Sequence, residues 1–360
     1  MYSLEKLYLY PSWKCNLQCK HCWVSSGPKY SEILELEYVN KAISEAVEFG
    51  LKLIKLSGGE PTLLLDYINT VTELCRKHQV ALSIETNGTL ITEKIAEAIS
   101  RANSYVNVSL DSFTEKNHNS FRCSDVAYKD TLKGIKILQK HSIPVGITYS
   151  ITHYCEAEID SMIQLLSYEG ITDLKINPIL RVGRAQDEII QFPYTLNTTD
   201  FEKLVQNYHG KSKNNVVIKT MVPPCFLPPT DIISGKKLPI VCNYLTQLSV
   251  LPDGTVGLCG EAKDIKAFQF GNIKKQALRD IWENSHVLNL LRNDIPNNIV
   301  GVCGFCKYKN NCLGGCRVAA FIDSKSHNGS NPYALDYYSM HGKLPYHQVN
   351  RNNASNSQNL

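Results

Sequence analysis

Cysteine is the residue type with the greatest capacity for chemistry in this sequence, with 13 copies among 360 residues. Three of them, Cys15, Cys19 and Cys22, form a C-x3-C-x2-C group near the start. A second group has the spacing C-x2-C-x5-C-x3-C and consists of Cys303, Cys306, Cys312 and Cys316. Dense spacing, an odd total and no recognisable secretion signal are typical of metal ligands rather than of a complete set of disulfides.

The first group has the right number of thiolates for an iron–sulfur cluster with a vacancy. Three cysteines leave one iron of a [4Fe–4S] cluster without a protein ligand, so a small molecule can coordinate it. The alternative is a zinc knuckle or a set of packed thiols. Structural zinc needs a fourth ligand, and His21 is badly placed for that role because it adjoins Cys22.

A second motif, Ser-Gly-Gly-Glu-Pro, occupies residues 57–61. Gly58 and Gly59 allow a ligand to approach the backbone closely, and the Glu60 carboxylate can accept hydrogen bonds from an ammonium group. The alternative is an ordinary Gly-Gly turn before a helix.

The elements that must position these groups follow from the hydrophobic periodicity. Short apolar runs predict strands at residues 4–10, 51–56, 81–85, 105–110, 145–151 and 173–177. Helical periods predict helices at 36–49, 64–78, 92–101, 126–141 and 156–168. Six such units predict an α/β fold, a partial (β/α)6 TIM-like barrel rather than a full eight-stranded one. Both motifs then follow strand ends on the face where parallel barrels carry their chemistry.

Beyond a further helix at 198–208, four prolines between residues 223 and 229 mark a domain junction. We expect a core domain at 1–215, a cysteine-rich iron–sulfur domain at 222–340 and a disordered tail at 346–360. Within the second domain, residues 245–259 predict a hairpin around a Pro-Asp-Gly turn, and 279–291 predict one helix.

The two motifs together resemble the radical S-adenosylmethionine (SAM) superfamily. The resemblance implies that Cys15, Cys19 and Cys22 hold a [4Fe–4S] cluster whose open iron binds SAM. Reductive cleavage of SAM then gives a 5′-deoxyadenosyl radical, which abstracts hydrogen from the substrate. The strand-end positions that match the family's SAM-binding residues are Gly58, Gly59, Glu60, Asn87, Ser109, Asp111 and Arg122.

The second group resembles the SPASM domain, which carries one or two auxiliary [4Fe–4S] clusters in many members of the superfamily. The resemblance assigns Cys242, Cys259 and Cys316 to the first auxiliary cluster, with Cys225 as an additional upstream ligand. It assigns Cys303, Cys306 and Cys312 to the second. The family's last cysteine is missing, because this chain has Ala334 after Asn-Pro-Tyr. We expect Asp336 to replace it; the alternatives are His341, an open iron, an incompletely formed cluster, or zinc at both sites.

The resemblance implies a flavodoxin or ferredoxin-like electron donor and an enzyme that modifies a ribosomal peptide or a protein. The first strand starts near residue 4, which leaves no room before it for a peptide-recognition domain. One alternative is a cofactor or small-molecule enzyme similar to the heme-pathway decarboxylases, and another is a non-catalytic metal-binding or electron-transfer protein. Cys123 and Cys155 are candidate hydrogen-atom donors, or spectator thiols.

Composition adds exclusions. A net charge of +4 without a basic run gives no support for nucleic acid or a membrane surface as a partner. No apolar run reaches the roughly 18–20 residues of a membrane span. With the cysteine usage, these features predict a cytoplasmic protein.

Overall fold

The computed structural model describes residues 2–179, 182–186, 196–234 and 238–342. The chain forms two compact units: unit 1 comprises residues 1–221 and 243–292, and unit 2 comprises residues 222–242 and 293–360. The residues from 222 onward are therefore divided between the two units. A single boundary between an N-terminal and a C-terminal domain does not describe this division. The expected tail at 346–360 lies outside the described residues.

Unit 1 is built on an eleven-stranded sheet in the order β11-β10-β9-β1-β2-β3-β4-β5-β6-β8-β7. Its centre consists of the six predicted strands, which run parallel and in chain order. They are β1 (Lys6–Leu9), β2 (Leu53–Leu56), β3 (Ala81–Thr86), β4 (Ser104–Ser109), β5 (Val145–Ile151) and β6 (Asp173–Pro178). Their ends lie within two residues of those predicted.

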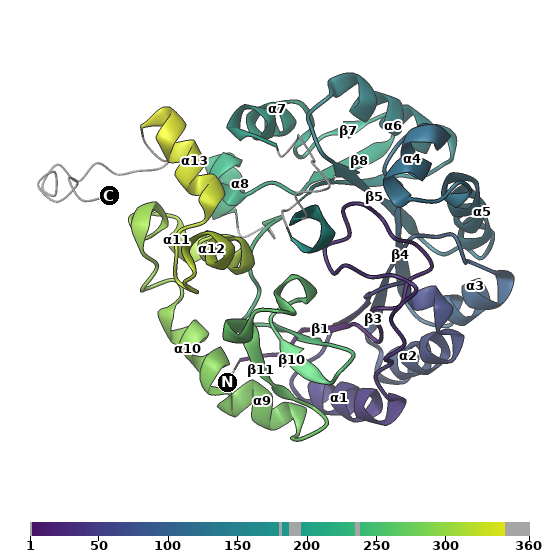
Figure 1. Ribbon diagram of the computed structural model, residues 1–360, viewed down its shortest axis with the longest axis horizontal. Helices are drawn as coiled ribbons and strands as arrows, with labels where there is room; N and C mark the ends of the chain where they lie inside the picture. The colour runs from purple at the N-terminus through teal and green to yellow at the C-terminus, as the bar shows by residue number, and fades with distance from the viewer. Residues whose placement is uncertain (1, 180–181, 187–195, 235–237, 343–360) are drawn as a thin grey trace, which may run out of the picture. The chain divides into compact units, whose positions relative to one another are not determined.

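Helices cover the outer face of this curved run of strands (Figure 1). The five predicted helices are confirmed to within one residue at each end: α1 (Leu36–Glu48), α2 (Leu65–His78), α3 (Glu93–Ser100), α5 (Ala127–Lys140) and α6 (Glu156–Tyr168). Alternate strand residues such as Leu7, Ile54 and Ile84 are fully buried. Burial of these side chains beneath the helices is what holds the α/β layers together.

Both edges of the central run are extended by later segments. The predicted hairpin is confirmed as β9 (Gln247–Val250) and β10 (Thr255–Gly257), with β11 (Gln269–Asn272) beyond it. The periodicity did not predict that β9 pairs in parallel with β1. On the other side, β8 (Val216–Thr220) pairs with β6 and with the short β7 (Ser212–Lys213). The helix α7 (Thr198–Tyr208) has the predicted bounds.

In unit 1, one predicted helix is wrong, and one helix of the (β/α)6 region was missed. Residues 279–291 form two helices, α9 (Leu278–Asn284) and α10 (His286–Asp294), because Ser285 leaves the helical conformation. Its hydroxyl donates to the carbonyl of Phe270 at 2.7 Å and accepts from the Leu288 amide, which competes with the helix. The missed helix is α4 (Glu115–Arg122), whose sequence is too polar to show an apolar period.

Unit 2 is a set of short elements around the second cysteine group. They are η3 (Pro224–Phe226), α8 (Pro229–Ile233), η6 (Gly301–Cys303), α11 (Lys309–Cys312), α12 (Arg317–Ser324) and α13 (Pro332–His341). The fully buried Arg317 joins the loops, since its guanidinium donates to the carbonyls of Gly314 and Gly329. No helix among the described residues is long and apolar enough to cross a membrane.

Candidate functional site

The loop after β1 brings Cys15, Cys19 and Cys22 into one packed cluster with Leu17 and Ala127. Cys15 and Cys19 are each only 7% exposed, and Cys22 is half-buried. Backbone amides already point at two of the sulfurs: the Leu17 amide lies 3.4 Å from Cys15 Sγ, and the Ser26 amide lies 3.3 Å from Cys22 Sγ. Such N–H groups stabilise a thiolate or a metal-bound sulfur more than a thiol.

The paired glycines after β2 hold this loop in place. The amide of Gly59 donates to the Ser12 carbonyl, and the amide of Glu60 donates to the Lys14 carbonyl, both at 2.8 Å. A Cβ atom on Gly58 would lie 2.6 Å from Ser12 O, and one on Gly59 would lie 1.9 Å from Lys14 O. The glycines are therefore required by the close approach of the cysteine loop itself, whether or not a ligand also approaches them.

Glu60 is buried at the centre of a hydrogen-bond network that links the ends of β2 and β3. Its carboxylate accepts from the Thr62 amide at 3.0 Å and from the Thr62 and Thr86 hydroxyls at 2.6 Å. The backbone amide of Asn87 is a further donor at 2.8 Å. Burial raises the pKa of Glu60, although these donors act in the opposite direction.

Asn87 connects this network to the cysteines. Its side-chain amide donates to Asn16 Oδ1 at 2.9 Å and lies 3.9 Å from Cys15 Sγ. Its own oxygen accepts from the Thr89 amide and hydroxyl. The side chain is thereby fixed in one orientation beside the first cysteine of the motif.

Asp111 and Arg122 form a buried ion pair beside Cys19. The Arg122 guanidinium donates to Asp111 Oδ2 at 2.5 and 2.6 Å, and its Nη1 lies 3.6 Å from Cys19 Sγ. The amide of Ser150 donates to the other oxygen of Asp111 at 3.0 Å. Burial acts to raise the pKa of Asp111, but the charge of Arg122 outweighs it and keeps the pKa below its ordinary value. A fixed positive charge is thus held against the cysteine loop.

Two histidines flank this pair, the half-buried His21 and the fully buried His118, and the sequence did not predict the part of His118. His21 stacks on Phe121 with ring centroids 4.3 Å apart, while His118 Nδ1 accepts from the Asp111 amide at 3.1 Å. Burial lowers the pKa of each histidine to about 4, so both are neutral at pH 7. Among the described residues, His21 Nδ1 and His118 Nε2 are buried without a hydrogen-bond partner.

Gly183 and Arg184, from the short helix η2 (Gly183–Gln186), clamp the cysteine loop and were also missed. The Arg184 side chain donates to the carbonyls of Cys19 at 2.9 Å and Ser26 at 2.6 Å. Its amide donates to the Cys22 carbonyl at 3.0 Å. A Cβ on Gly183 would lie 2.4 Å from that carbonyl oxygen. A Gly-Arg pair more than 150 residues from the cysteine motif carries no sequence pattern that would predict its contact with that loop.

Cys259 lies in unit 1, beside the strand that leads into the first cysteine group. The amide of the next residue, Gly260, donates to the hydroxyl of Tyr10 at 3.2 Å. A Cβ on Gly260 would lie 2.5 Å from the ring of Trp23. Residues that are more than 230 positions apart in sequence thus meet at the carboxyl end of β1.

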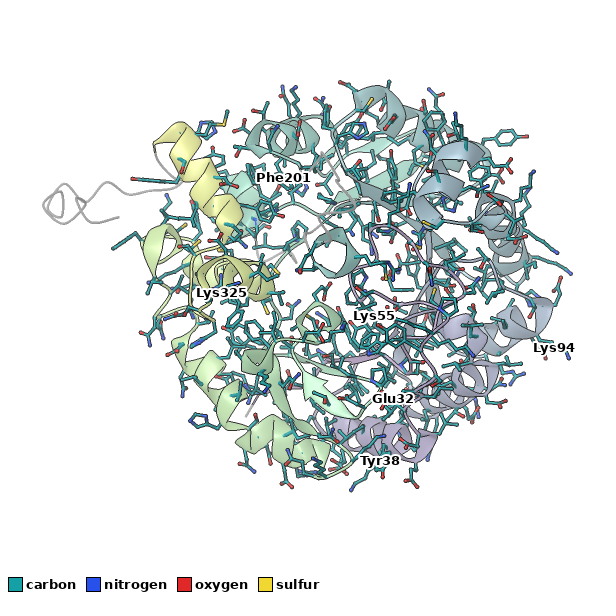
Figure 2. The ribbon with its side chains drawn as sticks, in the orientation of Figure 1. Glu32, Tyr38, Lys55, Lys94, Phe201 and Lys325 are labelled. Atoms are coloured by element: carbon teal, nitrogen blue, oxygen red, sulfur yellow. The ribbon has the colours of Figure 1, made fainter. Side chains whose placement is uncertain are left out.

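The inner face of the sheet is polar. Lys55 on β2 and Lys175 on β6 lie 2.9 and 3.5 Å from the same oxygen of Glu85 on β3. Side chains such as Ser83 and Asn107 share this face. About a fifth of the surface of the Glu85 side chain remains accessible. Figure 2 shows Lys55 near the middle of unit 1, whereas Tyr38 and Lys94 lie on its outer helices.

The other candidates on this edge of the sheet are less tied into the network. Ser109 ends β4 and is half-buried. Cys123 is exposed at the end of α4. Cys155 precedes α6, and its sulfur lies within 4.8 Å of ligand atoms of His153 and Glu158.

In unit 2, four thiols line a single pocket: Cys225, Cys303, Cys306 and Cys312. Cys316 does not line this pocket, and its sulfur accepts from the Ala319 amide at the start of α12. Asp336 is exposed on α13 and does not line this pocket.

The chain matches two known protein-family models, and each match contains cysteines of one of these two groups. Residues 9–166 match the family model of the radical SAM superfamily, and residues 242–307 match that of an iron–sulfur cluster-binding domain, SPASM. The parallel α/β fold and the clustered cysteines define an iron–sulfur enzyme that uses SAM. The chain belongs to the radical SAM superfamily, in the group whose members carry a SPASM domain with auxiliary iron–sulfur clusters.

Its relatives differ in what they make. The chain is 27% identical to an AdoMet-dependent heme synthase of Methanosarcina barkeri, over 89% of this chain and 93% of that one. It is 26% identical to the mycofactocin maturase MftC of Mycobacterium tuberculosis, over 91% and 82%. The fold is similar to that of Streptococcus suis SuiB bound to its precursor peptide SuiA, with a TM-score of 0.71 and 16% identity over 92% of this chain and 75% of that one.

Proposed function

We propose that Cys15, Cys19 and Cys22 hold the catalytic [4Fe–4S] cluster. The observation that carries this assignment is the packing of all three thiols at the carboxyl end of β1. When bound there with SAM, such a cluster supplies an electron for cleavage to a 5′-deoxyadenosyl radical. The amides of Leu17 and Ser26 orient and stabilise two of the sulfurs.

The surrounding polar residues fit a charged ligand such as SAM. Arg122 supplies a positive charge for a carboxylate, and Asp111 keeps that guanidinium in place. Gly58, Gly59, Glu60 and Asn87 fix the cysteine loop that would hold the cluster, and Ser109, at the end of β4, would line the SAM site beside them. The unpartnered His21 Nδ1 supports this fit, because a buried nitrogen without a partner is costly unless a ligand satisfies it.

We propose that the substrate is a peptide. The polar inner face of the sheet favours it, since backbone amides find hydrogen-bonding partners there in Lys55, Glu85 and Asn107. A porphyrin ring would instead need largely apolar walls. The name of the relative MftC, a maturase, and the SuiB–SuiA complex are consistent with this choice.

A tetrapyrrole is the second candidate, because the heme synthase of Methanosarcina barkeri matches this chain over 93% of its own length. Lys55 and Lys175 could then pair with the substrate's carboxylates. In either case an external flavodoxin or ferredoxin-like protein would supply the electron. The cytoplasmic location and the hydrogen-donor roles of Cys123 and Cys155 stay predictions.

The assignment of the first cluster is tested by anaerobic reconstitution of the wild type and of a Cys15→Ala, Cys19→Ala, Cys22→Ala variant. We expect the wild type to form 5′-deoxyadenosine with SAM and a strong reductant, and the variant to form none while losing about four iron atoms. A variant that still cleaves SAM would refute the assignment. Cys75→Ala, a buried thiol of α2, is the matched control.

The substrate class is tested by hydrogen transfer. A deuterated short peptide encoded beside the gene, and a deuterated iron porphyrin with carboxylate side chains, are each incubated with SAM and reductant. We expect deuterium in 5′-deoxyadenosine, seen as a mass shift, with the peptide only. Transfer from the porphyrin alone would reverse the choice of substrate.

A further inference from the structure

Cys225 meets the second cysteine group in space, although it is 78 residues away from Cys303 in sequence. Its sulfur lines the same pocket as those of Cys303, Cys306 and Cys312, and none of these four cysteines is in a disulfide. Four thiolates around one cavity are a complete ligand set for a [4Fe–4S] cluster. We propose that Cys225 is the fourth ligand of the auxiliary cluster in unit 2, rather than a ligand of the other auxiliary cluster.

The position of Ala334 explains why a ligand is needed from elsewhere. Ala334 stands where the resemblance to the SPASM domain calls for a cysteine, and in the structure it lines this same pocket with only 4% of its surface exposed. Its methyl group cannot coordinate iron. The pocket therefore has the usual site for a fourth ligand, but the thiol comes from η3 instead of α13.

The expected replacement, Asp336, does not fit. It lies two residues after Ala334 on the same helix, which turns its side chain by roughly 200° about the helix axis. It is exposed, and so is His341. Neither residue lines the pocket, whereas Asn331, which caps the N-terminus of α13, and Ala334, three residues later, both do.

The backbone around Cys225 is held firmly enough to present a ligand. Pro223 and Pro224 precede it, and proline fixes φ. The next residue, Phe226, packs edge-on against Tyr337 of α13 with ring centroids 5.4 Å apart. On the other side of the pocket, the amide of Cys303 is held by the Ser330 hydroxyl at 3.0 Å. These contacts join η3, η6 and α13 around the four sulfurs.

This assignment bears on the role of the cluster. Four protein thiolates leave no vacant iron, so this cluster can carry electrons but cannot bind substrate directly. The inference rests on the auxiliary iron–sulfur clusters of the SPASM group and not on the identity of the substrate.

The test counts iron in a background without the catalytic cluster, so that a failure of SAM cleavage cannot affect the result. Into the Cys15→Ala, Cys19→Ala, Cys22→Ala protein we introduce Cys225→Ala, and separately Asp336→Ala and Cys75→Ala. After anaerobic reconstitution, the iron, zinc and sulfide contents are determined by chemical analysis. Mössbauer and EPR spectra are then recorded to identify the type of cluster. We expect Cys225→Ala to change the spectra and to lose up to about four iron atoms, because the remaining three thiolates leave one iron of the cluster without a protein ligand. Asp336→Ala and Cys75→Ala should change neither the iron count nor the spectra.

A rescue variant separates ligation from folding. Cys225→Ala combined with Ala334→Cys supplies the thiol from another residue that lines the same pocket, and we expect it to restore the iron count and the spectrum. An unchanged iron count together with unchanged Mössbauer and EPR spectra in Cys225→Ala would overturn the proposal. So would iron loss in Asp336→Ala, failure of Ala334→Cys to rescue, or zinc instead of iron as the metal released by Cys225→Ala.

Discussion

Gly59 shows how one residue constrains the catalytic loop. Its missing side chain lets the Lys14 carbonyl come within 1.9 Å of where a Cβ would stand. The Gly-Gly-Glu-Pro motif is thus a packing surface for the cysteine loop, in addition to any contact with a ligand.

We expect Gly59→Ala to displace that loop and to lower both the iron content and the stability, by about 1–3 kcal/mol as for other overpacked sites. Gly50→Ala is the control, because Gly50 has nothing within 4 Å of its Cβ position, although its φ is positive and that of Gly59 is not. It should cost only the roughly 1–2 kcal/mol of left-handed backbone strain and retain iron. Equal iron contents in the two variants would contradict the argument. Iron analysis and thermal unfolding measure both effects.

The Asp111–Arg122 pair permits a second prediction at this scale. Asp111→Asn leaves a buried guanidinium without its counter-ion, and we expect a loss of about 3–5 kcal/mol in the free energy of unfolding. Glu73→Gln removes the exposed partner of Arg76 and should leave the free energy of unfolding almost unchanged, because solvent screens this ion pair. Denaturant unfolding under anaerobic conditions compares the two variants. Similar losses in the free energy of unfolding would show that the buried pair stabilises the protein no more than the exposed pair does.

At the scale of elements, ion pairs between side chains join three strands of unit 1, in addition to the hydrogen bonds of the sheet. Burial acts to raise the pKa of Glu85, but Lys175 and Lys55 outweigh it and lower the pKa from 4.5 to about 2. A lowered carboxyl pKa adds stability above the unfolded value of 4.5, and this stability is lost as the pH falls toward 2.

Accordingly, we expect wild type to be more stable than Glu85→Gln by about 2 kcal/mol at pH 6–7, an amount reduced because part of the side chain is accessible. The difference should shrink as the pH falls below 4.5. Unfolding of both proteins is measured from pH 3 to pH 7. A difference that does not depend on pH would mean that the charge of Glu85 contributes nothing to the effect.

At the scale of the whole molecule, the chain leaves unit 1 at residue 221 and returns to it at 243. The returning segment supplies β9, which covers the edge of β1. Leu7 and Leu9 of β1 are fully buried, so an uncovered β1 would be an apolar sheet edge prone to aggregation.

We therefore expect a fragment of residues 1–292 to be folded by circular dichroism and to remain monodisperse, whereas a fragment of residues 1–221 aggregates. Size-exclusion chromatography of the two fragments measures the difference. If residues 1–221 alone gave a monodisperse folded protein, β9 would not be required to complete the sheet.

Local pattern was enough to predict much of this protein. Most helices and strands of the (β/α)6 region carry their own period, and Cys15, Cys19 and Cys22 lie within one short loop, so the region and the motif were both predicted from sequence alone. The break in the helix at Ser285 was not predicted, because it depends on a hydrogen bond to Phe270 on the strand β11. Likewise, α4 has no apolar face for a period to show.

What only the tertiary structure decided are the contacts between distant segments. The pairing of Asp111 with Arg122, the clamp from Arg184 and the parallel docking of β9 on β1 leave no local trace. Cys225 is the clearest case. Its position upstream of Cys242 in sequence suggested that the two bind the same cluster, whereas in the fold Cys225 lines one pocket with Cys303, Cys306 and Cys312. Sequence spacing determines ligands that share one loop, but a ligand contributed by another segment is determined by packing.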